Sequence, residues 1–234
     1  MGEIGQAAAT AAGLIARADP DLAEIVGRSL TVSVTAVAAA SALGLPAGAL
    51  LATRAFRGRA AVVAVLNALM GLPPVVVGLL VYLALSRSGP LGTLGLLFTP
   101  AAMIVAQTVL ILPIVASLSY QVAAELWGEY RDQLRSLGAG PWRSVATLLW
   151  DGRFGLATAV LAGFGRATAE VGAVMIVGGN IDHATRVMTT AIALETSKGD
   201  LALALALGLI LIALSMTISV AITVVNAATR RAYG

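Results

Sequence analysis

The residues of this sequence that could carry chemistry are the polar and charged side chains inside its apolar stretches, because they are costly to place there. Arg166 and Glu170 are four residues apart, a spacing at which two side chains on one helix can form an ion pair. Asn67 and Gln107 place neutral amides in two further apolar stretches. A charge at the centre of a bilayer costs about 2.5–3.5 kcal/mol on insertion scales. Such residues therefore indicate either a solute pathway or polar contacts that hold helices together.

Several reaction chemistries are excluded by composition. The sequence contains no Cys and a single His, His183, which lies in a polar loop. Disulfides, thiolate metal sites and Cys nucleophiles are therefore ruled out. An intramembrane hydrolase needs a nucleophile with a neighbouring base, and a zinc enzyme needs a ligand set. Neither is present in the apolar stretches, and we expect no role for His183.

The overall composition is that of a polytopic membrane protein. Apolar residues make up 59% of the 234 residues and charged residues 12%, against roughly 45–50% and 25% in soluble domains. The net charge is +3. Because the cations lie between apolar stretches, they indicate membrane orientation and no nucleic-acid partner.

The sequence predicts an all-α fold with about five transmembrane helices. A span needs roughly 20 apolar residues, and its backbone must be helical because lipid offers no hydrogen-bond partner. Five stretches qualify: Ser29–Ala52, Ala60–Ser86, Pro100–Tyr120, Phe154–Val177 and Leu201–Ala227. Residues 3–17 are too short for a span and predict an interfacial helix. We therefore expect an N-terminal extracytoplasmic segment at 1–28 and a transmembrane domain at 29–231.

Two features of the spans bear on packing and gating. Pro73 and Pro74 remove two backbone donors and must bend or break the second span, which creates either a gate or a static kink. In the fourth span, a stripe of small residues at a spacing of four predicts close helix packing. Its members are Gly155, Ala159, Gly163 and Ala167.

Orientation follows from the distribution of cations. One alternate set of loops holds nine cations: Arg54, Arg57, Arg59, Arg131, Arg135, Arg143, Arg153, Arg230 and Arg231. The other set holds five: Arg17, Arg28, Arg87, Arg186 and Lys198. The positive-inside rule predicts that the first set and the C-terminus are cytoplasmic. With five spans, the N-terminus lies outside.

The cytoplasmic segment 121–151 predicts two amphipathic helices joined by a turn. A first apolar stripe consists of Leu126, Tyr130, Leu134 and Leu137, while Asp132 and Arg135 are spaced to pair on the other side. Gly138 predicts a left-handed helix stop, and Pro141 suits the first turn of the next helix. A second stripe consists of Val145, Leu148 and Leu149. From these residues alone, the segment is either a docking element or an amphipathic loop resting on the bilayer.

This segment resembles the cytoplasmic "EAA" loop of type I ABC importer permeases. The similarity lies in Arg131–Leu149, with RSLGAGPWRSVATLL at its centre. Asp132-Gln133-Leu134, or a neighbouring register, stands where the family has Glu-Ala-Ala, and Leu149-Trp150-Asp151 stands where it has a Leu-Pro ending. Residues 67–100 and 163–200 resemble the tungstate-type permeases, which are relatives of the molybdate and sulfate permeases.

The resemblance implies the type I ABC permease fold and a homodimer that imports an oxyanion, tungstate or also molybdate. It implies a dimer of ATPase subunits as partner, which binds ATP and Mg, and an extracytoplasmic oxyanion-binding protein. This chain would then be no enzyme and hold no cofactor, and it lacks a Gly-rich phosphate loop. The implied location is the cell membrane. An ion-coupled secondary transporter is the alternative, although such folds usually contain internal repeats and none is evident.

The resemblance also assigns a task to residues of the loop. ATPase coupling is expected of Glu129, Asp132, Leu137, Gly138, Ala139, Pro141 and Trp142. The polar residues and prolines within the spans are separate candidates for the pathway or gate: Asn67, Pro73, Pro74, Gln107, Arg166 and Glu170. For the amides and the charged pair, helix–helix contacts are the competing interpretation.

Overall fold

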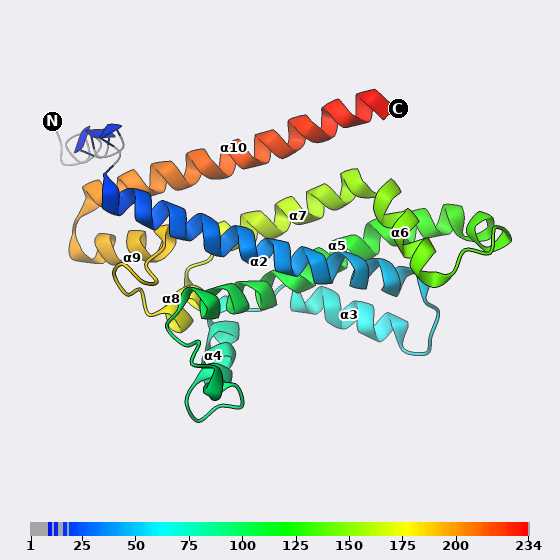
Figure 1. The fold of residues 1–234 in the computed structure, drawn as a ribbon, viewed down its shortest axis with the longest axis horizontal. Coiled ribbons are helices and arrows are strands. Elements are labelled where there is room, and N and C mark those ends of the chain that lie inside the picture. The colour runs from blue at the N-terminus through cyan, green and yellow to red at the C-terminus, as the bar shows by residue number, and fades with distance from the viewer. Residues whose placement is uncertain (1–8, 11, 14–15, 18, 234) are drawn as a thin grey trace. The chain divides into compact units, whose positions relative to one another are not determined.

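The computed structural model describes residues 9–10, 12–13, 16–17 and 19–233. These residues form helices, turns and loops without a strand, so the all-α prediction is confirmed (Figure 1). The helices are α2 (Pro20–Thr53), α3 (Arg59–Leu69), α4 (Pro74–Leu85), α5 (Pro100–Ser136), α6 (Pro141–Asp151), α7 (Arg153–Thr168), α8 (Gly172–Gly178), α9 (Met188–Lys198) and α10 (Leu201–Tyr233). A 3₁₀ turn, η1, spans Gly92–Leu94. The interfacial helix expected at 3–17 falls largely outside the described residues.

Three of these helices, α2, α5 and α10, are long and apolar enough to cross a membrane, and up to five spans result when each bent helix pair counts as one. The boundaries differ from those expected. Helix α2 starts at Pro20, ahead of Ser29, and α5 continues past Tyr120 to Ser136. The expected fourth span, Phe154–Val177, is wrong as a single helix because α7 ends at Thr168 and α8 begins at Gly172.

The chain divides into two compact units. Unit 1 comprises Met1–Thr35, Pro73–Gln107 and Ala167–Val220, and unit 2 comprises Ala36–Leu72, Thr108–Arg166 and Ala221–Gly234. Helices α2, α5, α7 and α10 contribute segments to both units.

Unit 1 is held together by the start of α2, the helices α8 and α9, and the first part of α10. Its core contains Leu22, Ile25, Met188, Ala191, Ala206 and Leu207. Ser29 in α2 accepts a hydrogen bond from the Met188 N–H at 2.7 Å. The short helices α4 and α8 pack tightly, since a Cβ added at Gly78 would lie 2.7 Å from the Ala173 Cα. Only glycine allows this approach, because a larger residue would overlap backbone atoms.

Unit 2 is organised around the middle and end of α5. Its core contains Ala49, Ala52, Ala123, Val145 and Leu148, from α2, α5 and α6. The small-residue stripe of α7 packs on α5, as predicted. A Cβ at Gly155 would lie 3.0 Å from Val122, and one at Gly163 would lie 2.8 Å from Ile111. Small residues thus let two helices approach closely without a polar contact.

Candidate functional site

The end of α5 is closed by a turn made of backbone hydrogen bonds. Gly138 has a positive φ of 66°. Its N–H donates to the Arg135 carbonyl at 3.0 Å, and the Ala139 N–H donates to the Leu134 carbonyl at 2.9 Å. This pair of bonds is a Schellman motif, which needs a left-handed residue at the position of Gly138. The predicted helix stop is confirmed, and Pro141 begins α6 as expected.

Helix α6 is braced against the rest of unit 2. Val145 and Leu148 are buried against Ala49, Ala52 and Ala123, and Leu149 packs on the same cluster. The predicted second stripe is therefore confirmed. The turn between α5 and α6 is rigid on both sides: a Schellman motif closes one helix, and a buried face holds the other.

The turn carries apolar side chains that the fold leaves uncovered. We call the segment Leu134–Trp142 the tip. Within it, Leu137 is 80% exposed and Trp142 is 67% exposed. Glu129 and Asp132 are also exposed on the preceding turns of α5. Exposed large apolar groups with a charged surround are typical of a protein–protein contact surface.

The tip differs from the predicted pair of surface helices in three respects. The first expected helix is the continuation of α5, because residues 121–136 contain helix formers and no proline. Leu137 does not extend the stripe of Leu126, Tyr130 and Leu134, which are partly buried, because the helix ends at Ser136. Asp132 pairs with Arg131 at 3.3 Å and not with Arg135.

The expected break in the second span is present. Helix α3 ends at Leu69 and α4 starts at Pro74, with Pro73 as the residue before its first turn. Asn67, near the end of α3, accepts a hydrogen bond from the Ser117 hydroxyl of α5. Asn67 thus makes the helix–helix contact that was the competing interpretation of its role.

Gln107 lies at a small cavity in unit 1. Its Nε2 donates to the Ala167 carbonyl at 3.2 Å, whereas its Oε1 is buried without a hydrogen-bond partner. The cavity is also lined by Ser29, Ser33 and Thr168, and its volume is about 20 Å³. That volume suits about one water molecule. A tetrahedral anion with four oxygen atoms does not fit there in this conformation.

Arg166 and Glu170 are not one turn apart on a continuous helix. Arg166 lies in the last turn of α7, and Glu170 lies in the break before α8. Glu170 is only 4% exposed, and its Oε1 accepts a hydrogen bond from the Ala173 N–H at 3.0 Å. Its backbone carbonyl accepts one from the Thr189 hydroxyl at 2.9 Å. Glu170 therefore supports the start of α8, whatever further role it has.

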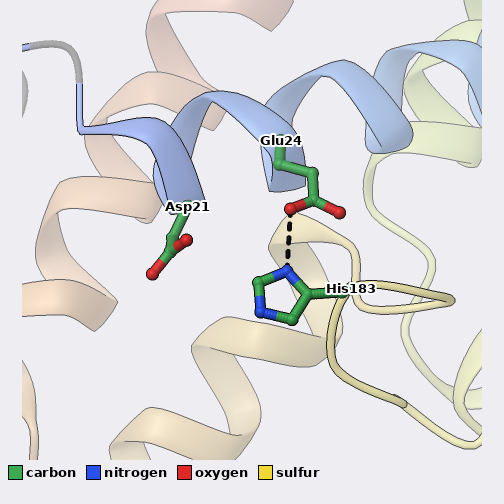
Figure 2. A group of neighbouring side chains, drawn as sticks. All are labelled: Asp21, Glu24 and His183. Carbon is green, nitrogen blue, oxygen red and sulfur yellow. Dashed lines mark hydrogen bonds and ion pairs between the residues drawn. The ribbon is translucent and has the colours of Figure 1, made fainter.

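A polar cluster at the start of α2 was missed by the sequence analysis. His183 Nδ1 lies 2.9 Å from Glu24 Oε2, and Figure 2 shows the imidazole, which comes from the loop after α8, pointing toward the carboxylate. Arg28 binds the other Glu24 oxygen and donates to the His183 carbonyl at 2.8 Å. We call Glu24, Arg28 and His183 the clasp. The spacing of Glu24 and Arg28 was a visible signal, but the contact with His183 spans 159 residues.

The electrostatics of the clasp are those of an ion-pair network. The hydrogen bond to Glu24, followed by the charge of Asp182, raises the pKa of His183 above its ordinary value. Ligand atoms of Asp21, Glu24 and His183 lie within 4.8 Å of one another, close enough to hold a metal ion. However, both Glu24 oxygens already accept hydrogen bonds, and the Arg28 cation adjoins them. We therefore interpret the cluster as a tether between α2 and the loop after α8.

Residues 44–231 match the family described as binding-protein-dependent transport system inner membrane component. The chain belongs to this family. It is 45% identical over 185 residues to a probable anion ABC transporter permease protein of Haloferax volcanii, covering 77% of this chain and 80% of that protein. It is 42% identical over 187 residues to the tungstate uptake system permease protein TupB of Peptoclostridium acidaminophilum, covering 80% and 82%. The TupB protein of Campylobacter jejuni is 44% identical over 133 residues, covering 57% and 56%.

Membership confirms the resemblance and the type I ABC permease fold that it implies. The chain is an ABC transporter permease with several membrane-spanning helices. The coupling and pathway roles of individual residues are not tested by membership and stay predictions.

Proposed function

We propose that this chain is the membrane subunit of an ATP-driven importer of tungstate that also passes molybdate. Two copies form the pathway, an ATPase dimer binds ATP and Mg on the cytoplasmic side, and an oxyanion-binding protein delivers the substrate outside. The chain itself needs no cofactor. The substrate class is supported by the relatives, which include a probable anion permease of Haloferax volcanii and a tungstate uptake permease of Peptoclostridium acidaminophilum.

The tip is the observation that carries this proposal. Leu137 and Trp142 are apolar yet exposed, although the chain buries Val145 and Leu148 immediately beside them. A partner that covers these side chains removes their apolar surface from water, at about 25 cal/mol per Å². Glu129 and Asp132 on the adjoining turns supply charged contacts at the rim.

The bracing of α6 explains how a partner's movement reaches the spans. Val145 and Leu148 share a buried cluster with α2 and α5, so a force on the tip acts on three helices at once. Helix α5 is continuous from Pro100 to Ser136, so the helix that ends at the tip also carries Gln107. Close-packed interiors transmit displacement and do not absorb it.

The two broken helices supply the movable part. Pro73 and Pro74 begin α4, Glu170 supports the start of α8, and these two short helices pack on each other. Non-helical backbone at membrane depth is tolerated where it is buried in protein or lines a water-filled cavity. We assign the gate to these two breaks, with Asn67 and Arg166 on the helices that precede them. Gln107 of α5 joins this assignment because it donates a hydrogen bond to the end of α7.

The cation distribution supports the orientation. The loop 54–59, the tip and the C-terminus face the cytoplasm, and the N-terminus and the clasp face outside. The tip then meets the ATPase, and the clasp lies on the side of the binding protein.

Uptake into proteoliposomes tests the function. The vesicles hold this chain, its ATPase and its binding protein, with and without ATP. We expect ATP-dependent tungstate uptake that molybdate inhibits and sulfate does not. Uptake that ignores ATP and follows an ion gradient would instead establish a secondary transporter.

Gly138→Arg tests the coupling assignment. The substitution strains a left-handed position and places a cation on the tip, so we expect association with the ATPase to be lost while membrane insertion is retained. Gly95→Arg is a matched control, because Gly95 is also left-handed and also has open space around it. Gly138→Asn, which tolerates the left-handed backbone, should keep most of the association. Normal co-purification of Gly138→Arg with the ATPase would contradict the assignment.

A further inference from the structure

Unit 2 contains an apolar groove that the proposed transport mechanism does not use. It has a volume of about 530 Å³ and lies between the end of α2, the following loop and α3. Its walls include Ala47 and Leu51 of α2, Phe56 of the loop, and Val62 and Leu66 of α3. Phe56 and Val62 are 48% and 46% exposed, so the groove is open along one side.

The mouth of this groove is cationic. Arg54 lines it, Arg57 follows in the same loop, and Arg59 is the first residue of α3. Gly58 turns the backbone there through a left-handed conformation with φ of 91°. The sequence contains no acidic residue between Glu24 and Glu125, so no carboxylate adjoins this loop along the chain.

The three arginines leave donors available. Within the described part of the chain, the exposed guanidinium groups of Arg54 and Arg57 make no ion pair. Arg59 donates to the Tyr120 hydroxyl at 3.3 Å and lies over its ring, yet its Nε is buried without a hydrogen-bond partner. Buried donors are normally satisfied, and exposed arginines beside an apolar wall attract an anion with an apolar body.

The dimensions fit an amphipathic ligand. The distance along the α2 axis from Ala47 to Arg54 is roughly 10 Å, at 1.5 Å per residue. The cationic mouth therefore lies at the end of an apolar groove about two helical turns long. Such a shape matches a phosphate group followed by the first part of an acyl chain.

We propose that this groove is a binding site for an anionic phospholipid. The phosphate is held by Arg54 and Arg57, and one acyl chain lies against Ala47, Leu51 and Val62. Basic pockets between transmembrane helices on the cytoplasmic side bind anionic head groups, and that leaflet is rich in anionic lipid. The loop 54–59 belongs to the cation-rich set of loops, which is the expected cytoplasmic side.

Native mass spectrometry of the full-length chain in detergent tests the site. The chain is titrated with phosphatidylglycerol or with phosphatidylcholine of the same acyl composition. We expect tighter retention of phosphatidylglycerol. Arg54→Gln combined with Arg57→Gln should weaken it about 30-fold, at about 1 kcal/mol for each arginine near a head group.

Two further variants separate the contribution of the arginine charges from that of the apolar groove. Ala47→Trp fills the exposed apolar wall without changing charge, and we expect it also to reduce phosphatidylglycerol retention. Arg87→Gln removes an exposed arginine from another loop and should have no effect. Equal retention of the two lipids, or retention that survives the double arginine substitution, would overturn the proposal. So would retention that depends on the arginines but ignores Ala47→Trp, because the head group would then bind without the groove.

A second copy of this chain is the competing occupant of the groove, and a cysteine variant distinguishes it from lipid. The chain has no Cys, so Ala47→Cys introduces a single thiol on the groove wall. Efficient disulfide-linked dimers of this variant would show that a second copy covers the groove and would overturn the lipid site. Alkylation of the thiol that is slowed by phosphatidylglycerol but not by phosphatidylcholine would support it.

Discussion

Two breaks interrupt the apolar stretches of this permease, and they are held in different ways. The break before α4 follows from local sequence: the Met70, Gly71 and Leu72 N–H groups close a turn on the preceding carbonyls, and Pro74 starts the next helix. The break before α8 contains no proline. Two hydrogen bonds hold it: the Ala173 N–H donates to the Glu170 carboxylate, and the Thr189 hydroxyl donates to the Glu170 carbonyl. The first break is a property of the backbone, and the second depends on a buried side chain and on α9.

The two breaks nevertheless produce one structure. Each begins a short helix, and the two helices, α4 and α8, pack through Gly78 against Ala173 and through Gly172 against Val75. A local break and a tertiary break therefore have to form together for the contact to be made. This difference predicts which substitutions the protein tolerates.

Gly78→Leu should have the largest effect on stability. Its Cβ would lie 2.7 Å from the Ala173 Cα, so α4 and α8 must separate, at a cost of about 3 kcal/mol at the upper range for overpacking. Thermal unfolding in detergent measures the change. Gly165→Leu is the control, because a Cβ at Gly165 meets nothing within 4 Å. Equal destabilisation by both substitutions would show that the α4–α8 contact is not the cause.

Glu170→Leu should come next. It removes the acceptor of the Ala173 N–H at a buried position, with a cost of about 2 kcal/mol from a lost cap and an unsatisfied donor. Glu170→Gln keeps an acceptor oxygen and should cost less in the same unfolding measurement. If Gln is as damaging as Leu, the charge of Glu170 matters more than its hydrogen bond.

Pro74→Ala should change stability by only about 0.5–1 kcal/mol, mostly through the greater freedom of the unfolded chain. The turn at Met70–Leu72 has its own backbone hydrogen bonds and persists without this proline. The measurement is the same thermal unfolding experiment, with Pro90→Ala in the exposed loop before η1 as the matched control. A loss as large as that of Glu170→Leu would mean that the first break is not locally determined.

The clasp should give the smallest effect, and its effect depends on pH. The pKa of His183 is raised by Glu24, so protonated His183 stabilises the tether fully below about 6.5, its ordinary value, and this contribution is lost as pH rises through the raised pKa. Hydrogen exchange of residues 179–187, corrected for the intrinsic rate, should therefore increase over that range. His183→Asn keeps the left-handed backbone at this position and should remove the pH dependence. An unchanged pH dependence in that variant would assign it to another group.

The sequence predicted those features that depend on neighbours along the chain. Gly138 stops α5 because only a left-handed residue completes the Schellman motif, and Pro73 and Pro74 break the second span because they lack donors. The stripe of Gly155 and Gly163 packs on α5 because small side chains permit it. Composition and span length were enough for the membrane class and the all-α fold.

The tertiary structure decided the features that depend on distant partners. No local signal divides the fourth span at Glu170, since its supports are Ala173 after the break and Thr189 in another helix. In the sequence, His183 is one residue of a polar loop, and only the folded structure shows that it contacts Glu24. Whether Leu137 is buried or exposed likewise depended on where α5 ended. Hydrogen bonds and burial between residues far apart in the chain have no periodicity in the sequence, so only the folded arrangement reveals them.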